Sequence, residues 1–201
     1  IRGPDSYPGC FNGRIYRHYM ESGKGFEADE LEQVRRVLHD NAIARAMRTF
    51  LHYIPRQSVV GIMGGHGLAR NEQEYADVAL MSKRLTEGGA LMISGGGPGA
   101  MEATHLGAWM AGRKEHDLTC AIDILCQAPT FKDSGWLDTQ FEVMGRYPQD
   151  TYKSLGLPTW LYGHEPPTPL ATHIAKFFDN SVREDAILTI AHGGLVFAPG
   201  S

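Results

Sequence analysis

Residues 90–102 read Ala90-Leu-Met-Ile-Ser-Gly95-Gly-Gly-Pro-Gly-Ala100-Met-Glu102. The apolar run 90–94 predicts a short buried strand, and the glycines after it predict a tight loop leading into a helix. Pro98 suits the first turn of that helix, because its missing N–H would be unpaired there anyway, and we expect the helix to reach about Gly112. This order of elements is typical of an α/β protein.

The same order occurs once before, between residues 58 and 89. Ser58-Val-Val-Gly-Ile-Met63 predicts a buried strand, and Gly64-Gly65-His66-Gly67 follows it as a glycine loop. Asn71 and Glu74 have the spacing of a capping box, which predicts a helix to about Glu87, closed by Gly88-Gly89. Buried strands that alternate with helices imply a parallel sheet, so we predict a Rossmann-like doubly wound α/β domain.

The flanking segments complete the predicted organisation. Residues 1–26 lack periodicity and predict an irregular arm, whereas 27–53 carry a helical apolar stripe that ends before Pro55. We therefore divide the chain into an N-terminal arm and helical extension, 1–55, and a Rossmann-like domain, 56–201. After residue 112 we expect helices around 118–125 and 136–143, a third strand at 157–162, helices at 168–178 and 181–191, and a fourth strand at 194–198.

Composition excludes several classes of protein. The chain has 201 residues, 42% of them hydrophobic, and a formal net charge of −4. No apolar run approaches the roughly 20 residues of a membrane span, and the mild acidity disfavours nucleic acid or anionic lipid as a partner. Three Cys without a CxxC spacing suit a reducing compartment, and the chain begins at Ile1 without a signal-like run. We expect a trimmed cytoplasmic protein.

The loop after the second strand is the first candidate site. A glycine loop that enters a helix N-terminus presents backbone N–H groups and a positive dipole end, which suits a phosphate group. A tight turn without a ligand is the alternative, but three consecutive glycines exceed what a turn requires. The predicted phosphate-binding residues here are Gly95, Gly96, Gly97, Pro98, Gly99, Ala100 and Met101.

The loop after the first strand should lie at the same edge of the sheet. Gly64 and Gly65 would line the resulting cleft, and His66 would either contact a base or ribose or be merely solvated. Residues 95–100 also match the G-x-G-x-x-A pattern of dinucleotide binding. The acidic residues at the required distance, Glu115 and Asp117, fall in helix-like sequence, which disfavours NAD.

Two charged residues are candidates for chemistry. Arg183 falls in the first turn of a predicted helix that Ser181 and Glu184 would cap, where a cation opposes the helix dipole and indicates an anionic partner. Glu102 falls in the first turn after the glycine loop, where it is either a site carboxylate or a dipole cap. No metal-ligand spacing and no nucleophile motif is present, so we expect no metal and no cofactor.

Residues 94–103, with Gly107-Ala108 after them, closely resemble the first signature of the Lonely Guy family of cytokinin-activating phosphoribohydrolases and bacterial nucleotide nucleosidases. That family's second signature is P-G-G-x-G-T-x-x-E. Pro199 and Gly200 match its opening, and Ser201 replaces its second Gly. Arg183 corresponds to an Arg that the family places in the helix before this signature. Residues 1–55 match no known pattern, and 113–156 resemble an insertion.

The resemblance implies hydrolysis of the N-glycosidic bond of a nucleoside 5′-monophosphate, with Arg183 and Glu102 as catalytic candidates and Pro199, Gly200 and Ser201 in the pocket. It places the family's key Glu six residues beyond Ser201, so we expect a domain cut short at its C-terminal end. It also implies a homo-oligomer. The alternative is a protein that binds a nucleotide or a phosphorylated metabolite without hydrolysing it, such as a cofactor carrier. The preferred base stays open.

Overall fold

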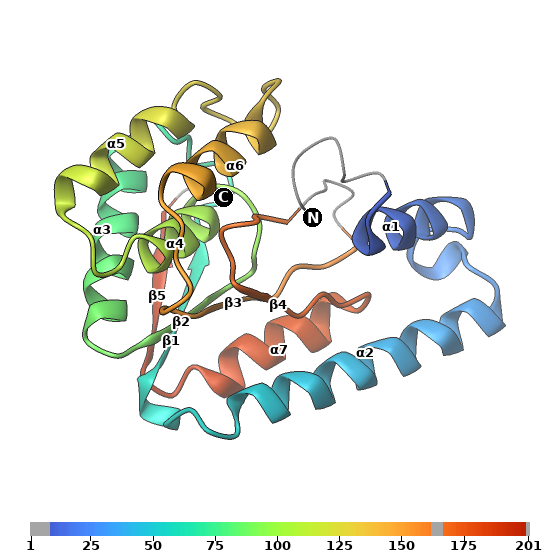
Figure 1. The fold of residues 1–201 in the computed structure, drawn as a ribbon. Helices are drawn as coiled ribbons and strands as arrows, with labels where there is room; N and C mark the ends of the chain where they lie inside the picture. Colours follow the sequence, from blue (N-terminus) through green and yellow to red (C-terminus); the bar gives the residue numbers. More distant parts are fainter. Residues whose placement is uncertain (1–8, 162–166, 200–201) are drawn as a thin grey trace.

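Five parallel strands form one sheet in the order β4-β3-β2-β1-β5 (Figure 1). The computed structural model describes residues 9–161 and 167–199. The strands are β1 (Val59–Gly64), β2 (Leu91–Ser94), β3 (Ser154–Gly156), β4 (His173–Ile174) and β5 (Gly194–Ala198). Each neighbouring pair is parallel, which confirms the predicted Rossmann-like α/β fold. The chain builds outward from β1 to β4 and then returns to the other side of β1, so the strand order reverses between β1 and β5.

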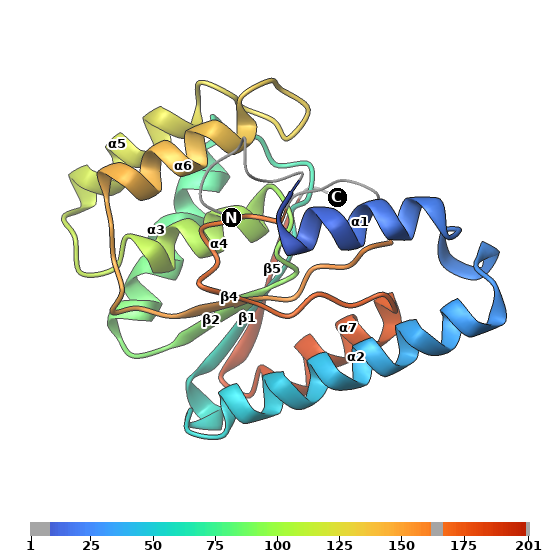
Figure 2. The same cartoon turned by 45° about the vertical axis from the view of Figure 1, so that its right-hand side comes forward.

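Helices cover both faces of the sheet (Figures 1 and 2). One face carries α3 (Gln73–Glu87) and α4 (Ala100–Trp109), with α5 (Glu115–Leu125) and α6 (Trp136–Arg146) outside them. The other face carries α2 (Glu30–Leu51) and α7 (Asn180–Ile190), and α1 (Phe11–Glu21) lies alongside the N-terminal half of α2. Single turns of 3-10 helix occupy Gly25–Glu27 and Arg56–Ser58.

The alternation of side chains along the central strands creates two hydrophobic cores. Ile62 of β1 and Met92 of β2 pack with the α3, α4 and α5 layer. Leu91 and Ile93 face the other way and pack with Ile187 of α7 and with the C-terminal half of α2. The central strands are therefore buried on both sides, which explains their continuous apolar sequence.

Most predicted elements are confirmed within a few residues. The strands at 59–64, 91–94 and 194–198 form where the apolar runs predict them, and the helices at 115–125 and 136–146 are present. The helical apolar stripe of residues 27–53 forms one helix, α2, whose N-cap Asp29 accepts a hydrogen bond from the Glu32 amide.

Three predicted elements are wrong. Residues 11–21 of the expected irregular arm form α1. The third strand lies at 154–156 rather than 157–162, because Pro158 has no N–H for the ladder and only Thr159 makes an isolated bridge, to Phe177. The expected helix at 168–178 is absent and β4 occupies part of it, since this segment pairs with β3 and the residues after it. Tyr162 and residues 163–166 lie outside the described residues.

The predicted helix caps also need correction. Helix α3 begins at Gln73 after N-cap Glu72, without a capping box from Asn71. The N-cap of α7 is Asp179, whose side chain accepts hydrogen bonds from two backbone amides, so Ser181 already lies inside the helix. Pro98 precedes the first turn of α4 rather than lying in it, because Gly99 with its positive φ of 68° takes the N-cap position.

Candidate functional site

The two glycine loops meet at the carboxyl edge of β1 and β2. The Ala100 amide donates a hydrogen bond of 3.0 Å to the Gly65 carbonyl oxygen. A Cβ added at Gly99 would lie 2.0 Å from that same oxygen, and one at Gly65 would lie 2.5 Å from the Ala100 Cβ. Only glycine permits so close an approach, so the loop residues predicted from separate parts of the sequence form one surface.

The N-terminus of α4 has the features of an anion site. Its N-cap, Gly99, supplies no side-chain cap, and the first intrahelical bond runs from the Ala103 amide to the Gly99 carbonyl. Helix geometry therefore leaves the amides of Met101 and Glu102 without an intrahelical acceptor. Together with the positive end of the helix dipole, these amides suit a phosphate group.

Arg183 of α7 lies against the triple-glycine loop. Its side chain is 10% exposed, and a Cβ added at Gly95 would be 2.7 Å from its Nη1 atom. The absence of a side chain at Gly95 thus makes the space that the guanidinium fills. Its Nη2 atom donates a hydrogen bond of 3.0 Å to Glu184. The structure therefore brings a cation from the far side of the sheet to the predicted phosphate loop.

The start of α7, and with it the position of Arg183, depends on α2. Asp40 of α2 accepts hydrogen bonds from the amides of Phe178 and Asp179 at 2.8–3.1 Å. Asp179 in turn caps the helix through the amides of Ser181 and Val182. A residue of the N-terminal extension therefore holds the first turn that carries Arg183.

Glu102 is fully buried in an ion pair with Arg70. Arg70 donates from Nη2 to Oε1 at 2.5 Å and from Nε to Oε2 at 3.1 Å, so both carboxylate oxygens are engaged. Burial raises the pKa of Glu102 above its ordinary value, and the charge of Arg70 partly offsets this effect. These contacts favour a structural function for Glu102. A catalytic function for it stays a prediction.

Arg70 was not among the residues singled out from the sequence. Besides Glu102 it donates to the carbonyl oxygens of Leu125, Ala128 and Trp136 at 2.8–3.1 Å. It thereby ties α4 to the α5–α6 connection. These partners lie 32 to 66 residues away in the sequence, so no local sequence pattern indicates them.

A cavity of about 240 Å³ opens beside the two loops. It is bounded by His66, Gly67, Pro98 and Gly99 on one side and by the α5–α6 connection on the other. The aromatic rings of His66 and Phe131 lie 5.3 Å apart at this cavity, and Trp136 also lines it. His66 is therefore part of a cavity wall, with an aromatic neighbour that the sequence did not predict.

His105 connects the loop to the strands. Its ring is fully buried between the hydroxyls of Ser94, at 2.8 Å, and Ser154, at 2.9 Å. Ser94 Oγ also accepts a hydrogen bond from the Gly96 amide, so the chain of contacts reaches the phosphate loop. Burial lowers the pKa of His105 to about 3, so the imidazole is neutral at pH 7.

The end of β5 approaches the first loop. A Cβ at Gly64 would lie 2.6 Å from the Ala198 carbonyl oxygen, and one at Gly65 would lie 3.4 Å from that of Pro199. Pro199 is thus near the glycine loops as predicted, whereas Gly200 and Ser201 lie outside the described residues. The three loops stand at the point where the strand order reverses, which is where open α/β sheets bind ligands.

Within residues 9–161 and 167–199, no group of three or more His, Cys, Asp or Glu side chains could hold a metal ion. None of the helices formed by these residues is long and apolar enough to cross a membrane. No protein-family model matches the chain, and no curated protein sequence matches it either. The fold defines the class, a Rossmann-like parallel α/β protein.

Proposed function

We propose that this protein binds a nucleoside 5′-monophosphate at the carboxyl edge of β1, β2 and β5 and hydrolyses its N-glycosidic bond. The products would be the free base and ribose 5-phosphate. The observation that carries the proposal is the contact of the Arg183 guanidinium with the Gly95 loop, beside the N-terminus of α4. The resemblance of residues 94–103 to a nucleotide-hydrolase signature supports the choice of substrate class.

The phosphate group would lie at the glycine loop. The Met101 and Glu102 amides would donate hydrogen bonds to it, and Arg183 would supply the compensating charge. The glycines at 95–97 allow a phosphate to approach the main chain without side-chain obstruction. Holding the phosphate at one end positions the sugar for attack at its anomeric carbon.

The base would occupy the cavity beside the loop. At about 240 Å³ and with His66, Phe131 and Trp136 on its walls, it suits a flat heteroaromatic ring that stacks on aromatic side chains. The ribose would then bridge the cavity and the phosphate loop. This placement puts the glycosidic bond near the ends of β1 and β2.

Cleavage of the bond builds positive charge on the ribose, which a nearby carboxylate stabilises while it orients water. Both oxygens of Glu102 are engaged by Arg70, so we do not assign this function to Glu102. The resemblance implies this function for a Glu that closes the family's second signature, at a position outside residues 1–201. If no such residue acts here, the site would bind the nucleotide without hydrolysing it, which is the alternative function.

The test is incubation of the full-length protein with a panel of nucleoside monophosphates, with release of free base and ribose 5-phosphate as the readout. The matching nucleosides without phosphate are the control substrates, and we expect no turnover of them. Binding of monophosphates without release would favour the alternative function. Neither binding nor release from any monophosphate would contradict both.

The matched variants are Arg183→Ala and Arg84→Ala. Arg183 is nearly buried at the loop, whereas Arg84 is an exposed residue of α3 that pairs with Glu115. We expect Arg183→Ala to weaken binding of the monophosphate about tenfold to 150-fold, the range for a lost charge-assisted hydrogen bond. Arg84→Ala should bind as the wild type does. Equal binding by both variants would remove Arg183 from the site.

A further inference from the structure

A second cavity lies at the amino edge of the sheet, opposite the edge that carries the glycine loops. It has a volume of about 390 Å³ and forms where the C-terminal ends of α2 and α7 meet the start of β1, at the lower left of Figure 1. Four exposed side chains with nitrogen donors line this basic cavity: Arg48, His52, Arg56 and His192. Of the described residues that line it, none is Asp or Glu.

The chain around the basic cavity does not neutralise its charges. Residues 41–71 and 186–201 contain no Asp or Glu, although the chain carries 23 acidic residues. These two segments supply every described residue that lines the cavity. Among residues 9–161 and 167–199, no carboxylate forms an ion pair with Arg48 or Arg56. The cavity therefore presents its positive charge to a ligand from outside the protein.

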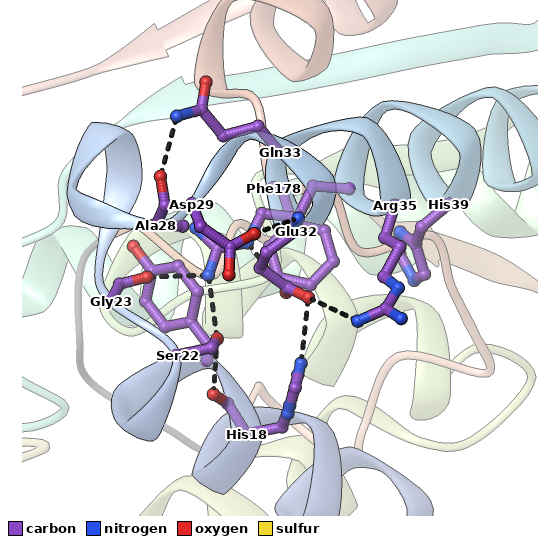
Figure 3. A network of polar contacts seen from close by, with 12 residues as sticks. His18, Ser22, Gly23, Ala28, Asp29, Glu32, Gln33, Arg35, His39 and Phe178 are labelled. Atoms are coloured by element: carbon purple, nitrogen blue, oxygen red, sulfur yellow. Dashed lines mark hydrogen bonds and ion pairs between the residues drawn. The ribbon is translucent and has the colours of Figure 1, made fainter.

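The N-terminal half of α2 shows how the fold holds the charges that it uses itself. Glu32 forms ion pairs with His18 of α1 at 3.1 Å and with Arg35 at 3.8 Å (Figure 3). Arg36 is only 6% exposed and donates hydrogen bonds to Glu32 and to two backbone carbonyl oxygens. The cation that serves the fold is thus buried and bonded, in contrast to the exposed cations of the basic cavity.

Backbone contacts hold the walls of the basic cavity together. The Gly193 amide, in the turn after α7, donates a hydrogen bond of 2.8 Å to the Val59 carbonyl oxygen. A Cβ added at Gly193 would lie 2.6 Å from the Gln57 carbonyl oxygen, so this turn packs directly on the segment that follows α2. The cations of three separate segments are therefore fixed around one cavity.

The helix dipole does not account for this arrangement. It favours a cation at Arg48, in the last turn of α2, but Arg56 and His192 come from the other two segments. The floor between them is aliphatic and partly or wholly buried: Leu51, Ile54, Val59 and Ile190. The volume lies within the range of small-molecule sites, about 300–1,000 Å³.

We propose that the basic cavity binds an organic diphosphate, with its phosphate groups at Arg48 and Arg56 and its organic part on the aliphatic floor. A guanidinium binds a phosphate group through paired hydrogen bonds, which suits the two arginines to two linked phosphates. The imidazoles of His52 and His192 each add at least one ring N–H donor. The inference does not depend on the proposed enzymatic function, which uses the opposite edge of the sheet.

The first test is calorimetric titration of the full chain with inorganic pyrophosphate. We expect a dissociation constant below about 1 mM at low salt, and weaker binding as salt is added. Orthophosphate has one phosphate group for two guanidiniums, so it should bind about tenfold or more weakly. No binding of pyrophosphate, or equal binding of orthophosphate, would overturn the proposal.

The second test locates the site with four variants. Arg48→Ala and Arg56→Ala should each weaken pyrophosphate binding about tenfold or more. Arg45→Ala is the matched control, because Arg45 is an exposed residue of the same helix that is not part of the cavity lining. Arg183→Ala changes the opposite edge of the sheet and should leave this binding unchanged. If Arg45→Ala or Arg183→Ala loses as much affinity as Arg48→Ala, the basic cavity is not the site.

The third test concerns the organic part of the ligand, with ADP and butyl diphosphate as probes. Because the proposed function also places a phosphate at the glycine loops, both probes are titrated into Arg183→Ala. At least one should bind about tenfold more tightly than pyrophosphate, since burying two methylene groups contributes about this much. The tighter probe identifies a ring or an aliphatic chain as the organic part. Equal affinity of both probes and pyrophosphate would refute the contact with the floor.

Discussion

Acidification should destabilise this protein in part through His105, whose ring is buried without charge between two serine hydroxyls. Burial lowers its pKa from 6.5 to about 3. In the unfolded chain the residue binds a proton near pH 6.5, whereas in the folded protein it stays neutral down to pH 3. Its contribution to stability is therefore fully present above pH 6.5 and is lost as the pH falls toward 3.

The magnitude follows from the difference between the two pKa values. Each pKa unit corresponds to about 1.4 kcal/mol, so lowering the pH from 7 to 5 should reduce the free energy of unfolding by about 2 kcal/mol. The full loss near pH 3 would be about 5 kcal/mol for this residue alone. Because the His105 ring contacts Ser94 and thereby the Gly96 amide, protonation should also disturb the phosphate loop.

The assay is urea unfolding followed by tryptophan fluorescence between pH 7 and pH 5. His105→Asn lowers stability at pH 7, since it leaves a small cavity, but it should remove about 2 kcal/mol of the pH dependence. His192→Asn is the control, because His192 lies exposed just after α7. If His105→Asn keeps the same dependence on pH as the wild type, His105 is not the group responsible.

Three further predictions concern the packing around the site. Glu102→Ala should lower the free energy of unfolding in urea by about 3–5 kcal/mol, because it leaves the Arg70 charge buried without its partner. The control Glu115→Ala breaks an exposed ion pair and should cost about 1 kcal/mol or less, so equal costs would contradict this account. Gly107→Ala should lower the free energy of unfolding by at least about 2 kcal/mol, because its Cβ would lie 2.1 Å from the Ala79 carbonyl oxygen where α3 and α4 cross. A melting temperature like that of the wild type would show that the two helices separate easily. Asp40→Asn should weaken nucleoside monophosphate binding without unfolding the protein, since it loosens the first turn of α7 that carries Arg183. Calorimetry measures the binding, and circular dichroism checks that the variant is folded. Unchanged affinity would mean that α7 holds its position without Asp40.

Much of the fold was predictable because its signals are local. The apolar runs 59–63 and 91–94 are buried on both faces, so their sequence differs sharply from that of the loops around them. The glycine loops after them mark the carboxyl edge, where the structure brings Gly65 and Ala100 into contact. Arg183 was singled out because a cation in a first helical turn needs an anionic partner, and it does lie against Gly95.

Other features carry no local signal. Strands β3 and β4 have three and two residues, and the pairing of β3 with β2 and of β4 with β3 defines them more than their own composition does. The N-cap residue Asp179 competes with the nearby Ser181, which has a similar propensity. Glu72 is not a preferred N-cap residue, yet it takes the N-cap position of α3 without a side-chain hydrogen bond. Phe131 became a candidate only once the fold had brought it beside His66.

The sequence by itself determined the order of strands, glycine loops and helices between residues 58 and 112, because burial pattern and glycine content act over a few residues. Only the tertiary structure decided what the charged side chains do. The sequence leaves Glu102 as either a site carboxylate or a dipole cap, and only the fold shows that Arg70, 32 residues away, engages both of its oxygens. The apolar stripe of residues 27–53 does not indicate that Glu32 and Arg36 are buried, or that Leu31 and Leu38 in the first half of α2 are exposed. The physical reason is that a buried charge requires partners, and partners distant in sequence are brought together only by the fold.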